Sequence, residues 1–305
     1  MRITLVLASC LITATAHAES FRTYLASYGN DSNPCTVTAP CRLLPAALAQ
    51  VADGGDIWML DSANFNGGTV DIAKSVSIQA IPGQVGSLVA VANAPAVSIS
   101  TLGVRIRMRN LAFTRNATNG GTYGIEMTGG VSLSVEDSAF TNFTTSAIYA
   151  HDFGGRVSIK DSSFTHLDDY AVRAENGPIT TIMESKFVGA TGGVGAFGTS
   201  STATLTTLIV SDCTFTGSDE AIAVIAQSPQ SSVRAFVNHS RIENGGIGIG
   251  TFAAGSANAA LSDVMIAGNN TGVLQNGGQI LSAGNNQIVG NSTNVSGTLT
   301  SSPLM

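Results

Sequence analysis

The chain has 305 residues and a formal net charge of −6, and only 11% of its residues are charged. This balance argues against a nucleic-acid or anionic-membrane partner, because both select for clusters of lysine and arginine. The 34 glycines, together with abundant serine, threonine and asparagine, favour a structure with many tight turns and a neutral polar surface.

The first 18 residues have the features of an export signal. Residues 3–16 are apolar or small after a basic second residue, and Ala16-His17-Ala18 reads as a cleavage site before Glu19. The mature chain, residues 19–305, is therefore expected to be secreted or periplasmic. The segment ending at Cys10 also resembles a lipoprotein acylation box, so anchoring through that cysteine is kept as a minor alternative. No later segment is apolar and long enough to cross a bilayer.

Two cysteines lie close together near the start of the mature chain. Cys35 and Cys41 are separated by a turn-forming loop, and in an exported protein this spacing predicts a local disulfide. Cys213 occupies a position that holds serine in other repeats. It is therefore expected to be a half-buried small residue, because no repeated feature places a base beside it.

The segment before the repeats predicts a cap. Residues 21–27 alternate as a strand, and residues 44–52 read as a short helix with Pro45 in its first turn and Gly54-Gly55 after its end. Such a helix would cover the open end of an apolar core. Strands are expected next at residues 56–60, 69–72 and 76–79.

From about residue 76 the chain repeats at intervals of 22 to 28 residues. Each repeat has an alternating strand, then a polar residue, and three positions later a large apolar residue. The apolar series is Phe113, Phe140, Phe164, Phe187, Phe215, Ile242, Ile266 and Ile288. The polar series is Asn110, Asp137, Asp161, Glu184, Asp212, His239, Asp263 and Asn285. A period in this range indicates a solenoid, in which no unit buries its apolar face alone.

A third short strand completes each repeat, at residues 124–127, 147–150, 171–174, 221–224, 246–249 and 272–274. Three strands and three turns in about 25 residues make one coil of a parallel β-helix. Helical repeats are disfavoured because no 3.6-residue period follows the cap, and a sandwich is disfavoured because its strands would not recur in threes. The prediction is an all-β solenoid of about 8–10 coils. Its parts are a signal peptide (1–18), a cap with the first strands (19–75) and the β-helix (76–305).

Stacking would place equivalent residues of adjacent coils about 4.8 Å apart. The apolar series then forms an internal ladder. A second ladder is expected from Met108, Val135, Ile159, Ile182, Val210 and Val237. The polar series should sit at a bend, where residues that tolerate left-handed backbone geometry are favoured.

The repeat resembles the pectin-lyase-like superfamily of right-handed parallel β-helix proteins, in its secreted bacterial form. The resemblance rests on the coil motif Val-x-Leu-x-Val-Glu-Asp-Ser-x-Phe-Thr-Asn at residues 131–142 and on the entry segment at residues 29–57. It implies the fold, whereas this fold carries lyases, hydrolases, epimerases, esterases and inert scaffolds alike. The catalytic signatures of the superfamily are mostly missing, and only Asp168-Asp169 matches one of them. The resemblance implies no cofactor, except Ca²⁺ if the protein is a lyase, and no metal ligands are predicted.

The third strands suggest a candidate site. If Ile125, Ile148 and Val172 face the core, then Glu126, Tyr149 and Arg173 point outward on three successive coils. Two residues further along, the same face carries Thr128, His151 and Glu175. His151 and Tyr149 are candidate bases and Arg173 a candidate partner for an anionic sugar. Residues on neighbouring turns that could line the same groove are Asp152, His166, Asp168, Asp169 and Tyr170. In later coils the first column continues as Gly195, Ala223, Gly248 and Leu274.

The alternative interpretation of this face is ordinary surface polarity on an unused side of a solenoid. A separate strand carries Arg105, Arg107 and Arg109 pointing outward, and Arg109 aligns with Glu136 and Lys160 on the next coils. That column indicates either a solvated ion ladder or an anion-binding stripe.

Two functions remain open from the sequence. The first is a non-catalytic scaffold that binds polysaccharide or a cell-surface glycan. The second is a polysaccharide-active enzyme, such as a uronate lyase, an epimerase or a glycoside hydrolase. The sequence predicts neither the glycan nor the oligomeric state.

Overall fold

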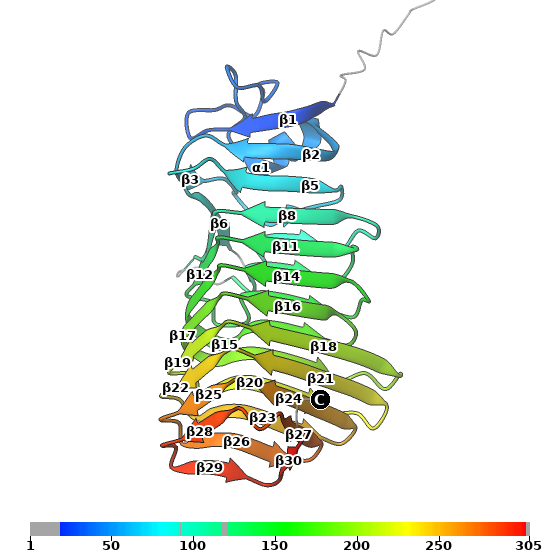
Figure 1. Cartoon of the computed structure of the whole chain (residues 1–305). Helices are drawn as coiled ribbons and strands as arrows, with labels where there is room; N and C mark the ends of the chain where they lie inside the picture. Colours follow the sequence, from blue (N-terminus) through cyan, green and yellow to red (C-terminus); the bar gives the residue numbers. More distant parts are fainter. Residues whose placement is uncertain (1–18, 92, 117–120, 303–305) are drawn as a thin grey trace, which may run out of the picture.

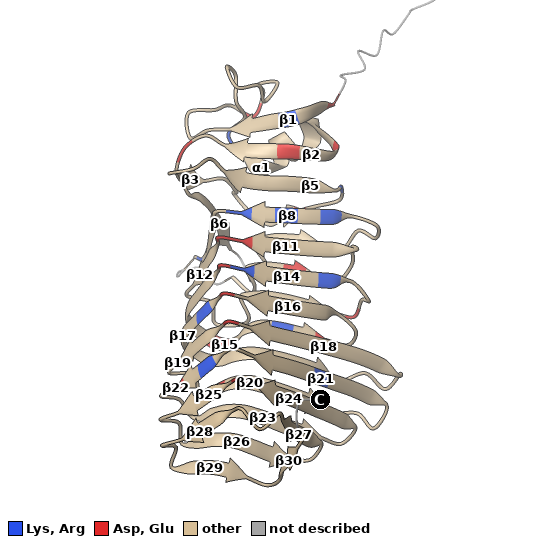
Figure 2. Cartoon of the chain, viewed as in Figure 1, with Lys and Arg blue, Asp and Glu red and all other residues tan. Residues whose placement is uncertain are grey.

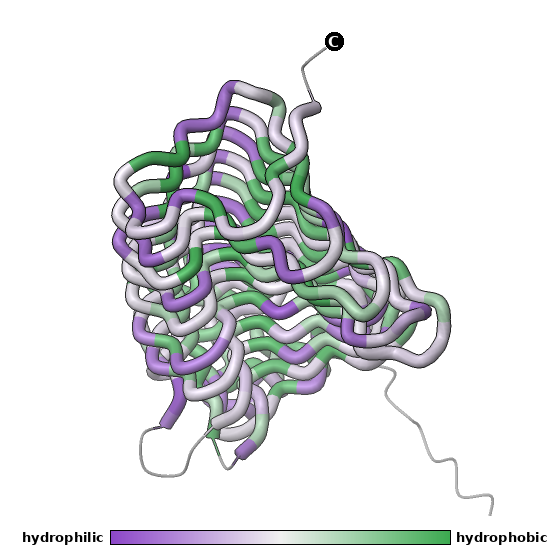
Figure 3. The backbone as a smooth tube through the Cα atoms, turned by 90° about the horizontal axis from the view of Figure 1, so that it is seen from below, coloured by the Kyte–Doolittle hydropathy of each residue, from purple (hydrophilic) through white to green (hydrophobic). Residues whose placement is uncertain are grey.

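The computed structural model describes residues 19–91, 93–116 and 121–302. The predicted signal peptide and Cys10 lie outside these residues. The described chain is a tall solenoid in which successive coils stack along one axis (Figure 1). Viewed down that axis, the coils superimpose around an enclosed core, with a lobe projecting on one side (Figure 3).

One wall of the solenoid is a twelve-stranded parallel sheet, here called sheet A. Its strands, in stacking order, are β1 (Ser20–Leu25), β2 (Val51–Met59), β5 (Val76–Ala80), β8 (Arg105–Arg109), β11 (Ser132–Glu136), β14 (Arg156–Lys160), β16 (Ile179–Met183), β18 (Thr204–Ser211), β21 (Ser231–Asn238), β24 (Ser256–Ser262), β27 (Gln279–Ser282) and β30 (Leu299–Ser301). Stacking is continuous from β1, so the stacked strands begin before the repeats are visible in the sequence.

The other walls are two strand stacks. The Phe stack contains β3 (Ala63–Asn64), β6 (Gly86–Ala90), β9 (Leu111–Arg115), β12 (Ala139–Thr141), the first part of β15 (Ser163–Glu175), the first part of β17 (Lys186–Gly198), β19 (Thr214–Thr216), β22 (Arg241–Glu243), β25 (Met265–Ala267) and β28 (Gln287–Val289). The third stack contains β4 (Val70–Asp71), β7 (Val97–Ile99), β10 (Ile125–Met127), β13 (Ile148–His151), the ends of β15 and β17, β20 (Glu220–Ala226), β23 (Ile247–Ala253), β26 (Thr271–Asn276) and β29 (Thr293–Ser296).

The predicted internal ladder is confirmed. The five phenylalanines from Phe113 to Phe215 are buried, and their rings stack with centroids 4.5 to 5.0 Å apart and interplanar angles of 3° to 7°. Ile242 and Ile266 continue the column in the core, whereas Ile288 near the end is only half-buried. The second ladder, from Met108 to Val237, is paired and buried as expected.

The bend between sheet A and the Phe stack also follows the prediction. Seven members of the polar series, from Asn110 to Asp263, have φ between 44° and 56°. Their backbone N–H groups still donate across the coils, for example from Asp137 to the Lys160 carbonyl at 3.2 Å. The residue after the bend is usually serine, and Cys213 takes this position with 1% exposure. Burial raises the pKa of the Cys213 thiol to about 11, so this cysteine is packed and unreactive, in line with its predicted structural role.

The amino-terminal cap is the predicted helix, α1 (Leu44–Gln50), which buries Leu44, Ala47 and Leu48 over the first coil. The helix was expected to run to residue 52 but ends two residues earlier. Its next residue, Val51, is extended at ψ 139° and pairs with Ser20 as the start of β2. The β-branched valine therefore joins the sheet rather than the helix.

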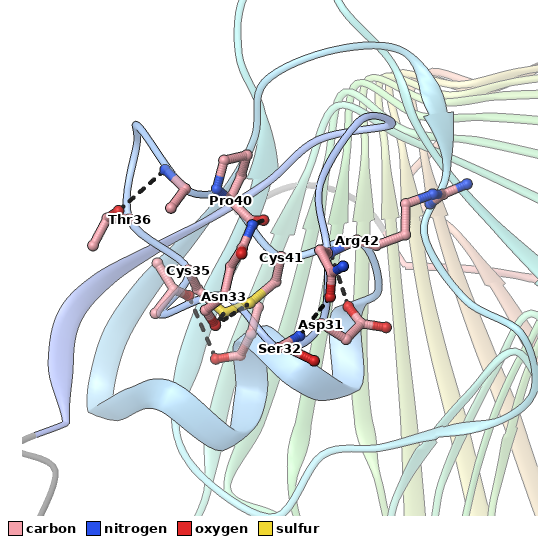
Figure 4. The surroundings of a disulfide bond; sticks show 12 residues. Asp31, Ser32, Asn33, Cys35, Thr36, Pro40, Cys41 and Arg42 are labelled. Carbon is pink, nitrogen blue, oxygen red and sulfur yellow. Dashed lines mark hydrogen bonds between the residues drawn. A yellow bond between two sulfur atoms is a disulfide. The ribbon is translucent and has the colours of Figure 1, made fainter.

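The predicted disulfide between Cys35 and Cys41 is present beside the helix (Figure 4). Around it the loop is held by short polar contacts. The Asn33 side chain donates to the Pro40 carbonyl at 2.8 Å, and the Asp31 carboxylate accepts from the backbone N–H groups of Arg42 and Leu43, each at 2.8 Å. The Asp31 carboxylate thus binds free amides at the start of α1.

Replacing Cys35 and Cys41 together with serine is expected to lower the free energy of unfolding by about 2 kcal/mol, because an unlinked loop gains entropy in the unfolded chain. Thermal unfolding with and without reductant measures this. The wild-type protein should fall to the stability of the variant when it is reduced, and the variant should not respond to reductant. A variant as stable as the oxidised wild type would show that the bond does not constrain the cap.

Charge is distributed unevenly along the solenoid (Figure 2). Residues 244–305 contain one charged side chain, Asp263, whereas basic residues gather on β8 and β14. The coils near β18 and β21 are also wider: these strands have 8 residues, against 5 in β14 and β16, and extend beyond them in Figure 1. Charged side chains therefore lie almost entirely in the first four fifths of the chain.

Candidate functional site

The candidate site lies on the outward face of the third stack. β10, β13 and the end of β15 pair in parallel, so that Glu126, Tyr149 and Arg173 occupy one column. The apolar partners predicted to face inward, such as Ile148, are fully buried. Strict alternation along each strand is therefore what projects the polar column outward.

Glu175 is the centre of a hydrogen-bonded group on this face. Its Oε2 atom accepts from Arg173 Nη2 at 2.8 Å, from Arg173 Nε at 2.9 Å and from the Tyr149 hydroxyl at 3.1 Å. Its Oε1 atom accepts from the Thr199 hydroxyl at 2.6 Å. Burial alone would raise the pKa of Glu175, but the hydrogen bonds from Thr199, Arg173 and Tyr149 outweigh it and lower the pKa. Glu175 is therefore an ionised structural anchor.

His151 sits between two carboxylates. Its Nδ1 atom is 2.8 Å from Asp152 Oδ2, and its Nε2 atom is 3.4 Å from Glu126 Oε1. The imidazole stacks on Tyr149 with centroids 4.0 Å apart and an angle of 19°. The hydrogen bond to His151 is the main reason that the pKa of Asp152 is lowered. Both ring nitrogens are thus occupied within the protein.

The aromatic part of the face continues on both sides. Tyr123 packs against Tyr149 with centroids 5.0 Å apart, and the Arg173 guanidinium lies 4.3 Å from the Phe197 ring centroid. Phe197 also meets Tyr170 edge-on at 5.1 Å. Phe197 itself is buried, with 4% exposure, so the aromatic surface beside the carboxylates comes from the partly exposed Tyr123, Tyr149 and Tyr170.

Tyr170 reaches two coils along the axis to hydrogen-bond the Glu220 carboxyl. This reach depends on Gly192 between them, because a Cβ atom there would lie 2.4 Å from the Tyr170 ring. The other Glu220 oxygen, Oε1, is buried without a protein partner. Burial raises the pKa of Glu220, although the hydrogen bond from Tyr170 opposes it.

These residues are called here the aromatic–acidic cluster: Tyr123, Glu126, Tyr149, His151, Asp152, Asp169, Tyr170, Arg173, Glu175, Phe197 and Glu220. Arg173 is its only lysine or arginine, and it is already bound to Glu175. Five carboxyl groups surround this one cation, so the cluster is acidic. An anionic sugar would meet repulsion here, and Arg173 is not free to neutralise it.

Some predicted residues lie elsewhere. Asp169 belongs to the cluster, because its charge acts on Arg173 and Tyr123. Asp168 and His166 instead line a separate depression of about 360 Å³ that Arg115 borders. Thr128 is exposed just past the end of β10. Adjacent aspartates at this bend thus face different sides of the coil.

The predicted continuation of the first column through Gly248 is wrong. Ala223 pairs with Gly250, and Ile222 pairs with Ile249 rather than with Ile247. Ile247 and Ile249 alternate identically in the sequence. In the later coils the core position lies seven residues after the apolar series, as in Phe215 to Ile222 and Ile242 to Ile249, whereas in earlier coils the separation is longer, as in the eight residues from Phe164 to Val172.

Three cluster members, Tyr123, Phe197 and Glu220, were not anticipated, and neither was Thr199; all four contact the predicted residues from other turns. For Glu220 the sequence contained a usable signal. Gly192 and Gly195 stand at outward positions of β17, and each leaves room for a bulky side chain from a neighbouring position. No comparable signal marks Thr199.

Within the part of the chain that the structure describes, no three histidine, cysteine, aspartate or glutamate side chains are grouped so that they could hold a metal ion. Among the same residues, no helix has the length and apolar character needed to cross a membrane.

A family model described as "Right handed beta helix region" matches residues 96–237. The pectate lyase Pel9A superimposes with a TM-score of 0.58, 14% identity, and coverage of 93% of this chain and 80% of that chain. The protein folds as a right-handed parallel β-helix. The parallel β-helix predicted from the repeats is confirmed, and so is its right-handedness.

Two further solved structures are similar to this β-helix. XylC in complex with xylose has a TM-score of 0.53 and 8% identity, with coverage of 85% of this chain and 71% of that chain. The GH136 lacto-N-biosidase from Eubacterium ramulus has a TM-score of 0.50 and 8% identity, with coverage of 93% and 68%. At these identities the likeness concerns the fold. A comparison with curated protein sequences finds no match.

Proposed function

We propose that this β-helix is a non-catalytic glycan-binding protein whose aromatic–acidic cluster recognises uncharged sugar residues. One observation carries the proposal: the ionisable side chains of the cluster are bound to one another, while aromatic ring faces and carboxylate oxygens remain beside them. Ring faces pack against the C–H face of a sugar, and carboxylates accept hydrogen bonds from its hydroxyl groups. Such a prearranged surface binds without an ordering cost.

Catalysis requires a group that can exchange a proton with the substrate near neutral pH. The pKa values of Asp152 and Glu175 are lowered, which makes both poor acids. Glu220 has a raised pKa, but Tyr170 binds one oxygen and the other is buried. His151 has a carboxylate at each nitrogen. These partners favour binding over turnover.

The choice of an uncharged sugar follows from charge. Only Arg173 is basic in the cluster, and Glu175 holds it. A uronate polymer would bring further negative charge to this face. The similar structures include a pectate lyase, XylC bound to the uncharged sugar xylose, and a lacto-N-biosidase. The acidic charge of the cluster favours an uncharged sugar over a uronate.

An exported location is part of the proposal. The Cys35–Cys41 disulfide supports it, because such bonds persist in oxidising compartments such as the periplasm or the extracellular space.

An enzyme remains the alternative, and the position of His151 between Asp152 and Glu126 is the observation that favours it. Incubating residues 19–305 with neutral and uronate-containing polysaccharides, with and without Ca²⁺, separates the two functions. Mass spectrometry should find bound glycan but no fragments. Unsaturated fragments would establish a lyase, and saturated fragments a hydrolase.

Replacing Tyr123 with alanine is expected to weaken binding of a neutral polysaccharide roughly tenfold, because a central aromatic contact is lost. Calorimetry or affinity electrophoresis measures this effect. Tyr28→Ala is the matched control, since Tyr28 is 72% exposed and far from the cluster in the sequence. Equal losses in both variants would contradict the site. Unchanged binding and turnover in both Arg173→Ala and His151→Ala would also contradict it.

A further inference from the structure

A second feature of the surface lies on sheet A, away from the aromatic–acidic cluster. Arg105 and Arg107 on β8 and Arg156 on β14 all point outward and are exposed. β8 and β14 appear in Figure 2 as the strands with the most blue on this wall. Within the described residues, none of these three guanidinium groups has an ion pair or side-chain hydrogen bond to the protein.

Other basic residues of the same strands are neutralised. Arg109 binds Asp137 at 2.7 Å, and Lys160 lies 3.5 Å from Glu184. Both of these pairs sit at the bend end of their strands. The middle and the opposite end of β8 and the start of β14 therefore carry the unbalanced positive charge.

The register places hydroxyl groups among these cations. Ser132 on β11 pairs with Arg105 on one side and with Arg156 on the other, and Ser134 pairs with Arg107. Two strand spacings put the backbones of Arg105 and Arg156 about 10 Å apart. The result is a flat basic patch with hydroxyl groups in its centre.

The guanidinium groups of this patch lie close enough to repel one another. Arginines at alternate positions of one strand lie on the same side, and like charges that close together destabilise a sheet. The chain as a whole is acidic, with 14 basic residues against 20 acidic ones. An external anion that bridges the guanidinium groups would relieve this repulsion.

We propose that this patch, formed by Arg105, Arg107, Arg156, Ser132 and Ser134, binds an anionic polysaccharide. The guanidinium groups bind its carboxylate or sulfate groups, and the serine oxygens accept hydrogen bonds from its sugar hydroxyls. The Ser134 hydroxyl itself donates to Glu136 at 3.2 Å. A flat, rigid sheet suits an extended polymer. A nucleic acid is a poorer fit, because none of the outward side chains of β5, β8, β11, β14 and β16 is aromatic, so no base could stack. This site is distinct from the cluster that would bind uncharged sugars.

The test compares two variants with the same change in charge. Arg105→Ser with Arg107→Ser removes two cations from the patch and introduces the residue type already present on β11. Lys186→Ser with Arg241→Ser removes two exposed cations from the Phe stack. Affinity electrophoresis at low and high salt then measures binding to alginate, dextran sulfate, neutral dextran and single-stranded DNA.

The patch variant should lose roughly tenfold in affinity for alginate or dextran sulfate at low salt, and the control variant less than about twofold. A preference for one polymer identifies carboxylate or sulfate as the recognised group. Tyr123→Ala should keep this binding, which separates the patch from the cluster. Equal losses in both double variants, DNA binding as tight as that of either polymer, or no wild-type binding to either polymer would each overturn the proposal.

Discussion

Replacing Phe164 with alanine is expected to lower the free energy of unfolding by about 3–5 kcal/mol. The ring is fully buried between Phe140 at 5.0 Å and Phe187 at 4.8 Å, and both neighbours stack nearly parallel to it. Alanine would leave a cavity that neighbouring coils cannot close, because their backbone spacing is set by hydrogen bonds. Urea unfolding followed by circular dichroism measures the change.

Phe21→Ala is the matched control, because Phe21 is 65% exposed on the first strand. Its effect should stay within about 0.5 kcal/mol, as for other surface substitutions. If Phe164→Ala cost no more than this control, the phenylalanine ladder would not be the principal source of packing energy between the coils.

Replacing Glu175 with glutamine should cost about 3 kcal/mol at neutral pH, because it leaves Arg173 as an unpaired, largely buried charge. The Glu175 and Arg173 side chains are only 11% and 29% exposed. The same substitution should weaken glycan binding, since Tyr149 and Thr199 also lose a charged acceptor. Thermal unfolding and calorimetry provide the two measurements.

The chain contains a natural control for this prediction. Arg241 and Glu243 have the same spacing along a strand and a 2.6 Å contact, but the arginine is 54% exposed. Glu243→Gln should therefore cost less than about 1 kcal/mol. Similar losses in the two variants would mean that Glu175 stabilises no more than a surface pair.

The cost of Glu175→Gln is expected to depend on pH. The folded-state pKa of Glu175 is lowered, so its stabilisation is fully present above the ordinary glutamate pKa of about 4.3 and is lost as pH falls through the lower folded value. The difference in stability between wild type and variant should therefore be constant near pH 6–7 and shrink below about pH 4. Unfolding curves at several pH values measure it, and a difference that grew on acidification would contradict the assignment.

The architecture was predictable because its information is local and repeated. An apolar residue every 22 to 28 positions, with a polar residue three positions before it, specifies both a core ladder and a bend. Parallel stacking then aligns every copy with its neighbours. A coil whose own pattern is ambiguous can therefore be assigned from the coils on either side. The columns through Phe164 and through Tyr149 follow from this register without any knowledge of long-range contacts.

The partners of the site residues could not be predicted in the same way. The pairing of Arg173 with Glu175, rather than with a ligand, depends on side-chain rotamers and on how far Thr199 and Tyr149 reach from other turns. The separation of Asp168 from Asp169 likewise depends on the local path of the bend.

Strand alternation in this sequence therefore specifies which residues face outward, and the repeat specifies the column that each one joins. The charge that a face presents was decided in three dimensions, because each ion pair depends on side-chain rotamers and on partners that other coils and turns bring near. Arg173 and Arg107 illustrate the difference: both are outward-facing arginines, yet one is bound by a neighbouring carboxylate and the other is not. An alternating pattern predicts whether a side chain points inward or outward, but it does not predict which side chain will contact it.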